Sequence, residues 1–165
     1  MKNRSINMLI VGFIVLAMMA VGLFVFIEYA HDVFPENITV SAEGKTTTTL
    51  PIRDLHLIPA GTKEYSVNLV CEASGDYNVI LEFNEEKDGG MKGFVNVTVS
   101  CDGESIFEGS LVELFEKGKT LEFIRTIEAD DPTVITFSYS MPREIGNEAQ
   151  GTFADFNVLL TIDKV

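Results

Sequence analysis

The sequence predicts an all-β fold: an antiparallel two-sheet sandwich, jelly-roll or immunoglobulin-like, with one short helix, preceded by an N-terminal transmembrane helix. Three observations predict it. An uncharged apolar run occupies residues 5–27, apolar and polar residues alternate in short segments from residue 37 onward, and Gly, Pro and Asp clusters separate these segments. The 165 residues suffice for one domain and an appendage, but not for two full domains.

The apolar run extends from Ser5 to Ile27. As a helix it would measure roughly 34 Å, which exceeds the hydrocarbon core of a bilayer at about 30 Å. Lys2 and Arg4 precede the run, and Glu28 follows it. The basic residues keep the N-terminal side in the cytoplasm, so the remainder of the chain is expected outside the cell.

Two alternatives remain for this leader. The hydrophobic region of a cleavable signal peptide usually has about 7–15 residues and ends at a small-residue cleavage site. Here the run is longer, and its best small residues, Ala20 and Gly22, lie inside it. We therefore expect residues 1–30 to form an uncleaved signal-anchor and residues 31–165 to form a single extracellular domain at the cell membrane. If the leader is cleaved, the domain is secreted or lies at the cell surface.

The alternation has a period of two residues and is clearest in the last segment, where Phe156, Val158 and Leu160 alternate with polar neighbours such as Asn157. Strands with this pattern bury one face and expose the other, as in antiparallel sheets. Their number and spacing are typical of a sandwich. We expect eight or nine strands, near Asn37–Ser41, Thr46–Ile52, Thr62–Ala73, Asp76–Asn84, Lys92–Cys101, Ser105–Glu108, Lys119–Ala129, Thr133–Met141 and Thr152–Asp163.

One segment departs from the alternation. Ser110 and Glu113 have the spacing of a capping box, in which Ser110 is the N-cap and Glu113 is the third helical residue. Lys117 falls near the C-terminal end of the segment, and Gly118 suits the position just after a helix. We expect a short helix at Leu111–Lys117 that caps an open end of the sandwich.

The charge of the chain excludes one class of partner. Lys and Arg total 12 against 25 Asp and Glu, which gives a net charge of −13 and a pI near 4.4. Nucleic-acid binding requires a positive surface, so we expect no nucleic acid as a partner. The negative charge favours solubility outside a cell.

The two cysteines, Cys71 and Cys101, continue the apolar faces of two expected strands and should point toward the core. A disulfide between them would stabilise the fold by roughly 3–4 kcal/mol if the geometry allows it, and exported proteins retain such bonds. The alternative is two buried free thiols, because cysteine packs as a small hydrophobic residue.

The sequence contains no recognisable catalytic constellation. His31 and His56 are far apart and belong to no paired zinc-binding motif, and the serines do not form a G-x-S-x-G sequence. The acidic clusters at 85–88, 102–104 and 130–131 fall at expected turns and lack the ligand series of a calcium loop. We therefore expect no enzyme activity, no cofactor and no metal site.

The stretch from Met141 to Gly151 leads through a turn into the long final strand, and the stretch Leu55–Thr62 leads through Pro59 and Gly61 into an alternating strand. Together they resemble the TasA/camelysin family of exported Gram-positive surface and biofilm-matrix proteins. In that family an Asn-x-x-Gln-Gly-like turn precedes the last strand and a Leu-x-Pro-Gly segment precedes a core strand. The turn residues that carry the resemblance are Pro142, Gly146, Asn147, Gln150 and Gly151.

The resemblance implies a jelly-roll-like subunit that assembles into extracellular fibres or coats. Members of the family polymerise by passing an N-terminal segment to the next subunit as an added strand. The corresponding donor segment here would be His31–Ser41, with Val33, Phe34, Ile38 and Val40 as its apolar anchors. The family's leaders are cleaved to free this segment. This chain lacks a clear cleavage site, which favours a membrane-tethered accessory or fibre base.

Three functions follow from the sequence, in order of preference. The first is a non-enzymatic, membrane-tethered surface protein that acts by self-assembly or by adhesion to other surface proteins. The second is a surface-displayed module that binds a glycan, a peptide or calcium. The third is a secreted metallopeptidase, as some relatives are labelled, although the chain has no zinc motif.

Overall fold

The computed structural model describes residues 33–165 except 43 and 116–119. The expected signal-anchor, with its helix at residues 5–27, lies outside the described residues. Within the described residues, no helix has the length and apolar character needed to cross a bilayer. One compact unit comprises Phe34–Val165.

Nine strands form the described domain, and each lies close to an expected one. They run β1 Asn37–Val40, β2 Thr46–Leu55, β3 Thr62–Cys71, β4 Gly75–Asp88, β5 Asn96–Cys101, β6 Glu104–Ser110, β7 Thr120–Ile127, β8 Thr133–Ser140 and β9 Ala154–Lys164. The fifth starts later than predicted, because a single 3₁₀ turn, η1 (Lys92–Phe94), occupies its expected beginning. A second 3₁₀ turn, η2 (Asn147–Ala149), lies in the connection before β9.

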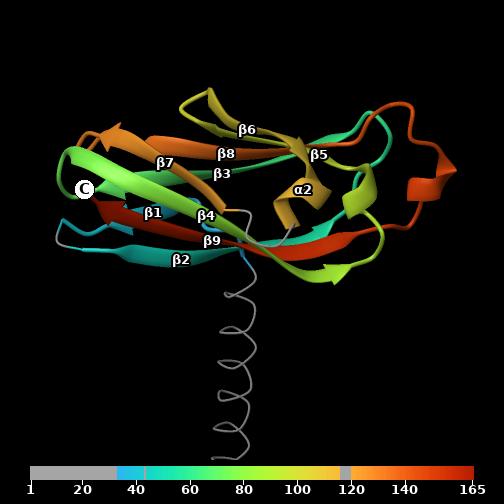
Figure 1. Ribbon diagram of the computed structural model, residues 1–165, viewed down its shortest axis with the longest axis horizontal. Coiled ribbons are helices and arrows are strands. Elements are labelled where there is room, and N and C mark those ends of the chain that lie inside the picture. Colours follow the sequence, from blue (N-terminus) through green and yellow to red (C-terminus); the bar gives the residue numbers. More distant parts are fainter. Residues whose placement is uncertain (1–32, 43, 116–119) are drawn as a thin grey trace, which may run out of the picture. The chain divides into compact units, whose positions relative to one another are not determined.

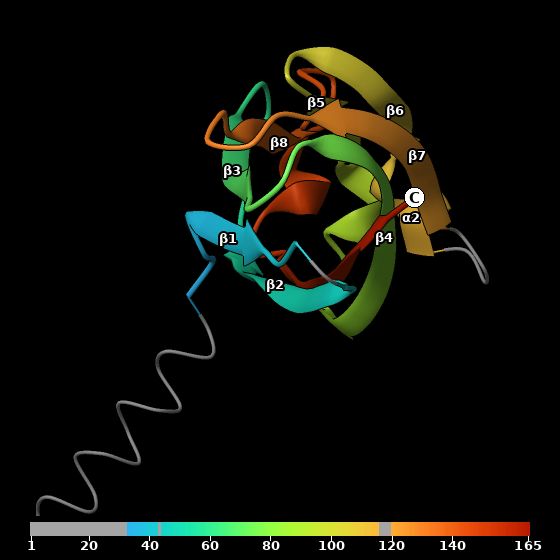
Figure 2. The same ribbon diagram turned by 90° about the vertical axis from the view of Figure 1, so that its left-hand side faces the viewer.

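The strands form two facing sheets, as Figures 1 and 2 show. Sheet A has five strands in the order β1-β3-β8-β5-β6, and sheet B has four in the order β2-β9-β4-β7. The expected sandwich is therefore confirmed. Strands β2 to β9 divide four and four between the sheets in a jelly-roll arrangement, and β1 extends sheet A at its edge.

The prediction of a wholly antiparallel sandwich is wrong at one place. β1 pairs with β3 in parallel, with Ile38 opposite Leu69 and Val40 opposite Cys71, whereas the other strand pairs are antiparallel. Antiparallel neighbours can be joined by a hairpin, but parallel ones need a longer crossover. Here the chain leaves β1, passes through β2 in the opposite sheet and returns as β3.

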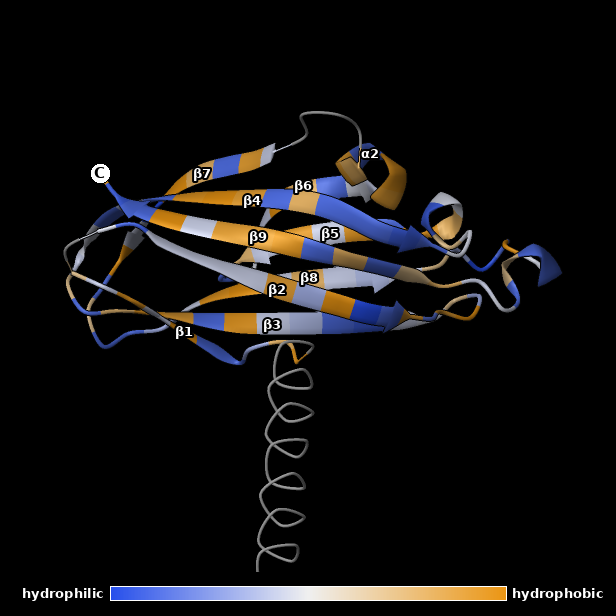
Figure 3. Cartoon of the chain, turned by 90° about the horizontal axis from the view of Figure 1, so that it is seen from below, coloured by the Kyte–Doolittle hydropathy of each residue, from blue (hydrophilic) through white to orange (hydrophobic). Residues whose placement is uncertain are grey.

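The core lies between the sheets and comes from the alternating positions that the sequence indicates. The largest fully buried side chains are Tyr77, Tyr139, Phe137 and Phe156, and they come from both sheets. Figure 3 shows the alternation as bands of apolar and polar residues along β9 and β4. Phe156 packs edge-on against the ring of Tyr139 at 5.6 Å between centroids. The hydrophobic effect of this layer is the main stabilising term of the sandwich.

The predicted capping box is confirmed. The Ser110 backbone N–H donates to the Glu113 carboxylate at 3.0 Å, and the Glu113 backbone N–H donates to the Ser110 hydroxyl at 3.3 Å. The helix that follows, α2, spans Leu111–Phe115. The expected end of the helix, with Lys117 and Gly118, lies outside the described residues. Phe115 brings α2 to the core, since its ring lies 5.3 Å from that of Phe156.

The free edge of sheet B at β2 is irregular. Pro51 occupies a position within this strand, and the pairing with β9 shifts register between Ile52 and Leu55. Asp54 lies in this bulge with φ at +52°, and its backbone N–H donates to the Asp155 carboxylate at 2.7 Å. The bulge extends β2 to Leu55, three residues beyond the predicted end at Ile52.

On the opposite side of the sandwich, where β6 and β7 lie in Figure 2, an arginine side chain connects the two sheets. Arg125 of β7 contacts Asp102, in the turn between β5 and β6, at 2.9 Å, and Glu104, the first residue of β6, at 3.1 Å. Hydrogen bonding to Asp102 raises the pKa of Arg125. The expected acidic turn at 102–104 therefore joins one sheet to the other.

Candidate functional site

The predicted donor segment lies in its own chain's sheet A. Among the described residues of this segment, β1 forms the edge, and its inward side chains fill the core beside β3. Val40 is fully buried and Ile38 is 7% exposed. Because they alternate with the exposed Asn37 and Thr39, β1 presents one apolar face, as the sequence indicates. His31 and Asp32 lie outside the described residues.

Phe34 continues this contact ahead of the strand. Its ring lies 5.2 Å from Tyr65 of β3 and 6.2 Å from Phe137 of β8, measured between centroids. Val33, by contrast, is 52% exposed. Three of the four predicted anchors therefore contact the core. The sequence did not predict that Tyr65 and Phe137 contact Phe34, because these residues come together only through the pairing of distant strands.

Polar contacts to β3 and its neighbours add to the backbone pairing of β1. Asn68 donates through its side chain to the Asn37 side-chain oxygen at 3.0 Å, and its backbone N–H donates to the Glu36 carbonyl at 2.9 Å. After the strand, the Ala42 backbone N–H donates to the Glu72 carboxylate at 3.1 Å. These partners lie on or next to β3, whereas Ile38 and Val40 attach β1 to the core.

The cysteines do not form the disulfide that was one of the two predicted alternatives. Both Cys71 and Cys101 are buried free thiols. Cys101 of β5 is level with Ile135 of β8, and Ile135 is level with Val67 of β3. Cys71 lies four residues further along β3, with β8 between the two strands. This places the two Cα atoms roughly 15 Å apart, far beyond disulfide reach. Burial raises the pKa of the Cys71 thiol and raises that of Cys101 to about 11, so both stay protonated.

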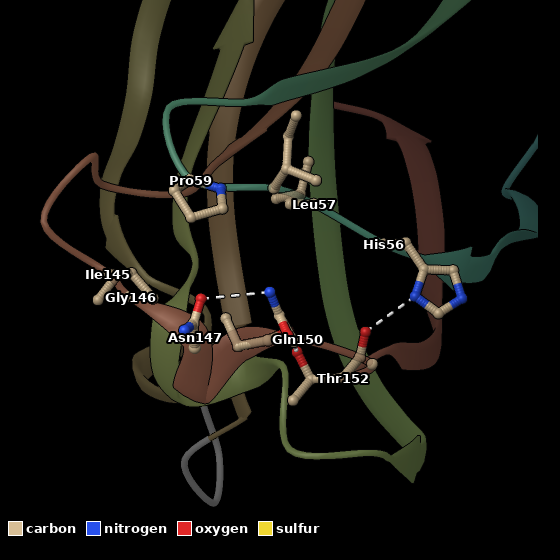
Figure 4. A pocket seen from close by; sticks show the side chains of 11 residues that line it. His56, Leu57, Pro59, Ile145, Gly146, Asn147, Gln150 and Thr152 are labelled. Atoms are coloured by element: carbon tan, nitrogen blue, oxygen red, sulfur yellow. Dashed lines mark hydrogen bonds between the residues drawn. The ribbon is translucent and has the colours of Figure 1, made fainter.

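The two stretches that carry the family resemblance meet at one end of the sandwich. The Ala60 backbone N–H donates to the Met141 carbonyl at 3.0 Å, and the Met141 N–H donates to the Gly61 carbonyl at 3.0 Å. Together they border a pocket of about 400 Å³, shown in Figure 4. Its lining includes Leu57, Ile58, Pro59, Ile145, Gly146, Asn147, Gln150, Gly151 and Thr152.

Several polar side chains that line this pocket form hydrogen bonds to neighbouring residues. Gln150 donates through its side-chain amide to the Asn147 side-chain oxygen at 3.2 Å (Figure 4). His56 contacts the Thr152 carbonyl through Nδ1 at 2.8 Å and the Asp54 carboxylate through Nε2 at 2.6 Å. The Asn147 and Gln150 side chains therefore stabilise the connection into β9.

The backbone of this turn agrees with the sequence in part. Gly151 has φ at +72°, a conformation that favours glycine, at the point where the chain turns into β9. Gly146, another glycine of this turn, has φ at −92°. Pro142 lies two residues after the end of β8, consistent with a residue that cannot continue the strand pairing.

The described residues contain no group of three or more His, Cys, Asp or Glu side chains arranged to hold a metal ion. The acidic cluster at 85–88 engages neighbouring basic residues instead: Lys92 contacts Glu85 at 2.9 Å and Asp88 at 3.3 Å. Hydrogen bonding to Glu85 raises the pKa of Lys92.

No known protein-family profile matches the chain, and no curated protein matches its sequence. Solved structures resemble its fold. One is a family 35 carbohydrate binding module from Clostridium thermocellum, 10% identical, which covers 73% of this chain and 98% of its own, with a TM-score of 0.38. Another is the dimeric latent PorU of Porphyromonas gingivalis, at 14% identity and a TM-score of 0.36.

A third is a β-glucosidase from Paenibacillus barengoltzii, at 11% identity and a TM-score of 0.32. The match covers 73% of this chain for PorU and 74% for the β-glucosidase, but only 13% and 11% of those two longer proteins.

Proposed function

We propose that this chain is an exported, membrane-tethered and non-enzymatic surface protein whose domains associate by exchange of β1 between neighbouring copies. The observation that carries the proposal is the position of β1. It is a four-residue parallel strand at the edge of sheet A, next to the expected membrane anchor. Addition of such a strand to an exposed sheet edge is a general mode of protein association.

The exchange requires that the site on β3 accept β1 of a second copy as well as its own. β1 pairs with β3, its side chains Ile38 and Val40 are buried in the core, and Phe34 ahead of it packs on the rings of Tyr65 and Phe137. Every copy of the chain presents the same acceptor site. The connection from Val40 to Thr46 has five intervening residues and can extend about 20 Å. β1 can therefore leave its own domain while β2 stays in sheet B.

The resemblance to TasA and camelysin supports the same proposal, since that family passes an N-terminal strand between subunits. The proposal differs from the family in the retained anchor. Exchange would then join neighbours that lie side by side in one membrane, and the product would be a surface layer or the base of a fibre.

The native Cys71 provides a direct test in the full chain, because it lies opposite Val40 in the β1–β3 register. A Val40→Cys variant in a Cys101→Ser background can form a disulfide to Cys71, either within one chain or between two. After mild oxidation in membranes, the proposal predicts a ladder of covalent multimers on a non-reducing gel, which a reductant removes.

Two controls make this test specific. Thr39→Cys in the same background places the thiol on the opposite face of β1, opposite Val70, and should give no ladder. Val40→Cys with Cys71→Ser removes the acceptor and should also give none. A disulfide found only within single chains at all surface densities would contradict the proposal.

A further inference from the structure

The outward face of sheet A has an unusual composition. Register places short polar side chains in rows across β3, β8, β5 and β6, whereas core residues occupy the alternate positions. No side chain in these rows is basic or aromatic. The rows comprise Thr62, Glu64, Ser66, Asn68, Thr136, Ser138, Ser140, Asn96, Thr98, Ser100, Glu108 and Ser110.

Some of these polar groups bond to one another on the side of β1. The Ser66 and Thr136 hydroxyls lie 3.1 Å apart, and the Asn68 side chain donates to that of Asn37. Toward β6 the face is hollowed by about 480 Å³ (the sheet A hollow), with Asn96, Thr98, Glu108, Gly109 and Ser140 as its lining. None of the side chains in this lining forms a hydrogen bond to another described residue.

Gly109 contributes only backbone to the hollow. It lies opposite the buried Val97, so a Cβ at this position would point to the inner face of the sheet, toward the Glu113 carboxylate and the Phe107 ring. The register between β5 and β6 shifts between Val99 and Ser100, a bulge that bends the edge strand.

The lining selects a class of ligand. One amide, two hydroxyls and one carboxylate offer donors and acceptors in several directions. The absence of a cation in the lining, together with the net charge of −13, disfavours anionic ligands such as phosphates. A lone carboxylate does not make a metal site, and the lining lacks the side chains that would hold an apolar ligand.

We propose that the sheet A hollow binds a neutral glycan, whose hydroxyl groups exchange hydrogen bonds with Asn96, Thr98, Ser140 and Glu108. Adjacent strands repeat these groups at about 4.8 Å, so a polymer of sugar units can continue from the hollow along the polar rows. The hollow lies on the side of sheet A away from β1, so glycan binding and strand exchange use different parts of the molecule. An assembled layer of the domain could therefore also hold surface polysaccharide.

The test uses the full chain in detergent and four neutral probes: cellohexaose, xylohexaose, maltohexaose and chitohexaose. Saturation-transfer NMR should detect binding of at least one probe. Calorimetry should show that the affinity for this probe falls at least about tenfold in Asn96→Ala and in Glu108→Gln, because each substitution removes hydrogen bonds to the ligand. Ser66→Ala lies on the same face but outside the hollow, and it should bind as the unsubstituted protein does.

Two results would overturn the proposal. One is no transfer to any of the four probes. The other is binding that persists unchanged in both Asn96→Ala and Glu108→Gln while their melting temperatures match that of the unsubstituted protein. The Val40→Cys variant, oxidised so that a disulfide to Cys71 holds β1 within its own chain, should still bind the glycan probe. This result separates the test of glycan binding from the test of strand exchange.

Discussion

The last strand of the chain and the first described strand are held in the fold in opposite ways. β9 has eleven residues, lies inside sheet B and pairs with both β2 and β4. β1 has four residues and pairs with β3 alone. Removing β9 would split sheet B, whereas removing β1 would leave eight strands and both sheets in place. Strand position therefore divides the molecule into a cooperative body and a separable edge.

The largest expected effect comes from the centre of β9. Phe156→Ala removes a fully buried ring that contacts both Tyr139 and Phe115. We expect a loss of about 3–5 kcal/mol in the free energy of unfolding, because the surrounding sheets cannot close the cavity. Urea denaturation followed by circular dichroism measures it. A loss below about 1 kcal/mol would show that β9 is less central than its pairing indicates.

The next effect is on alkaline stability. Burial raises the pKa of the Cys101 thiol to about 11. The pKa in the unfolded chain is lower, near the ordinary value, so the unfolded state loses its proton first as the pH rises. The protonated Cys101 thiol therefore stabilises the folded state fully below about pH 9. This stabilisation decreases as the pH rises toward 11, by about 2–3 kcal/mol in total.

Measuring the free energy of unfolding from pH 8 to 11 in Cys101→Ala tests this effect, since the variant should show a shallower decline. Cys71→Ala is the matched comparison beside β1. Burial also raises the pKa of Cys71, but a hydrogen bond from Tyr77 opposes the shift, so its contribution should be smaller. Equal slopes for Cys101→Ala and the unsubstituted chain would contradict the prediction.

A smaller effect is expected at the edge. Val40→Ala removes two buried carbon atoms from β1, which corresponds to about 1–2 kcal/mol of lost burial. If β1 opens independently, hydrogen exchange should accelerate at the β3 amides that face it, while the β9 amides stay protected. Equal acceleration in β9 would show that β1 belongs to the cooperative body.

The smallest effect concerns the helix beside β9. Ser110→Ala removes the hydroxyl that accepts from the Glu113 N–H and should cost about 1 kcal/mol. Because Phe115 of α2 packs on Phe156, the loss should appear in the global unfolding transition. Ser110→Thr keeps a capping hydroxyl and should recover most of the stability. No recovery would indicate that the hydroxyl acts through another contact.

The number, position and facing of the strands could be predicted from the sequence, because alternation reports directly which side chains are buried. The partners of the strands could not, since pairing depends on contacts between distant segments. β1 illustrates the limit: Ile38 and Val40 indicated a strand, but nothing local indicated a parallel pairing with β3. The failed alternative for Cys71 and Cys101 has the same origin, because the face of each residue was correct and the offset between their strands was not visible.

The site shows a similar division. The anchors Phe34, Ile38 and Val40 could be named from their alternation, and the capping box from its spacing. The sheet A hollow could not be predicted, because its lining comes together only through the register of β8, β5 and β6. Serine, threonine and asparagine on a strand normally indicate only a solvated face.

The edges of the two sheets are unequally protected against unintended pairing. At β2, Pro51 and the bulge at Asp54 interrupt the row of free backbone groups, and such devices discourage aggregation. β3 has neither a proline nor a register shift along its ten residues, and β1 covers its edge from Asn68 to Cys71. A chain that lacks residues 1–41 would expose this part of the β3 edge for pairing with strands of other chains, so we expect it to aggregate more readily than the full chain.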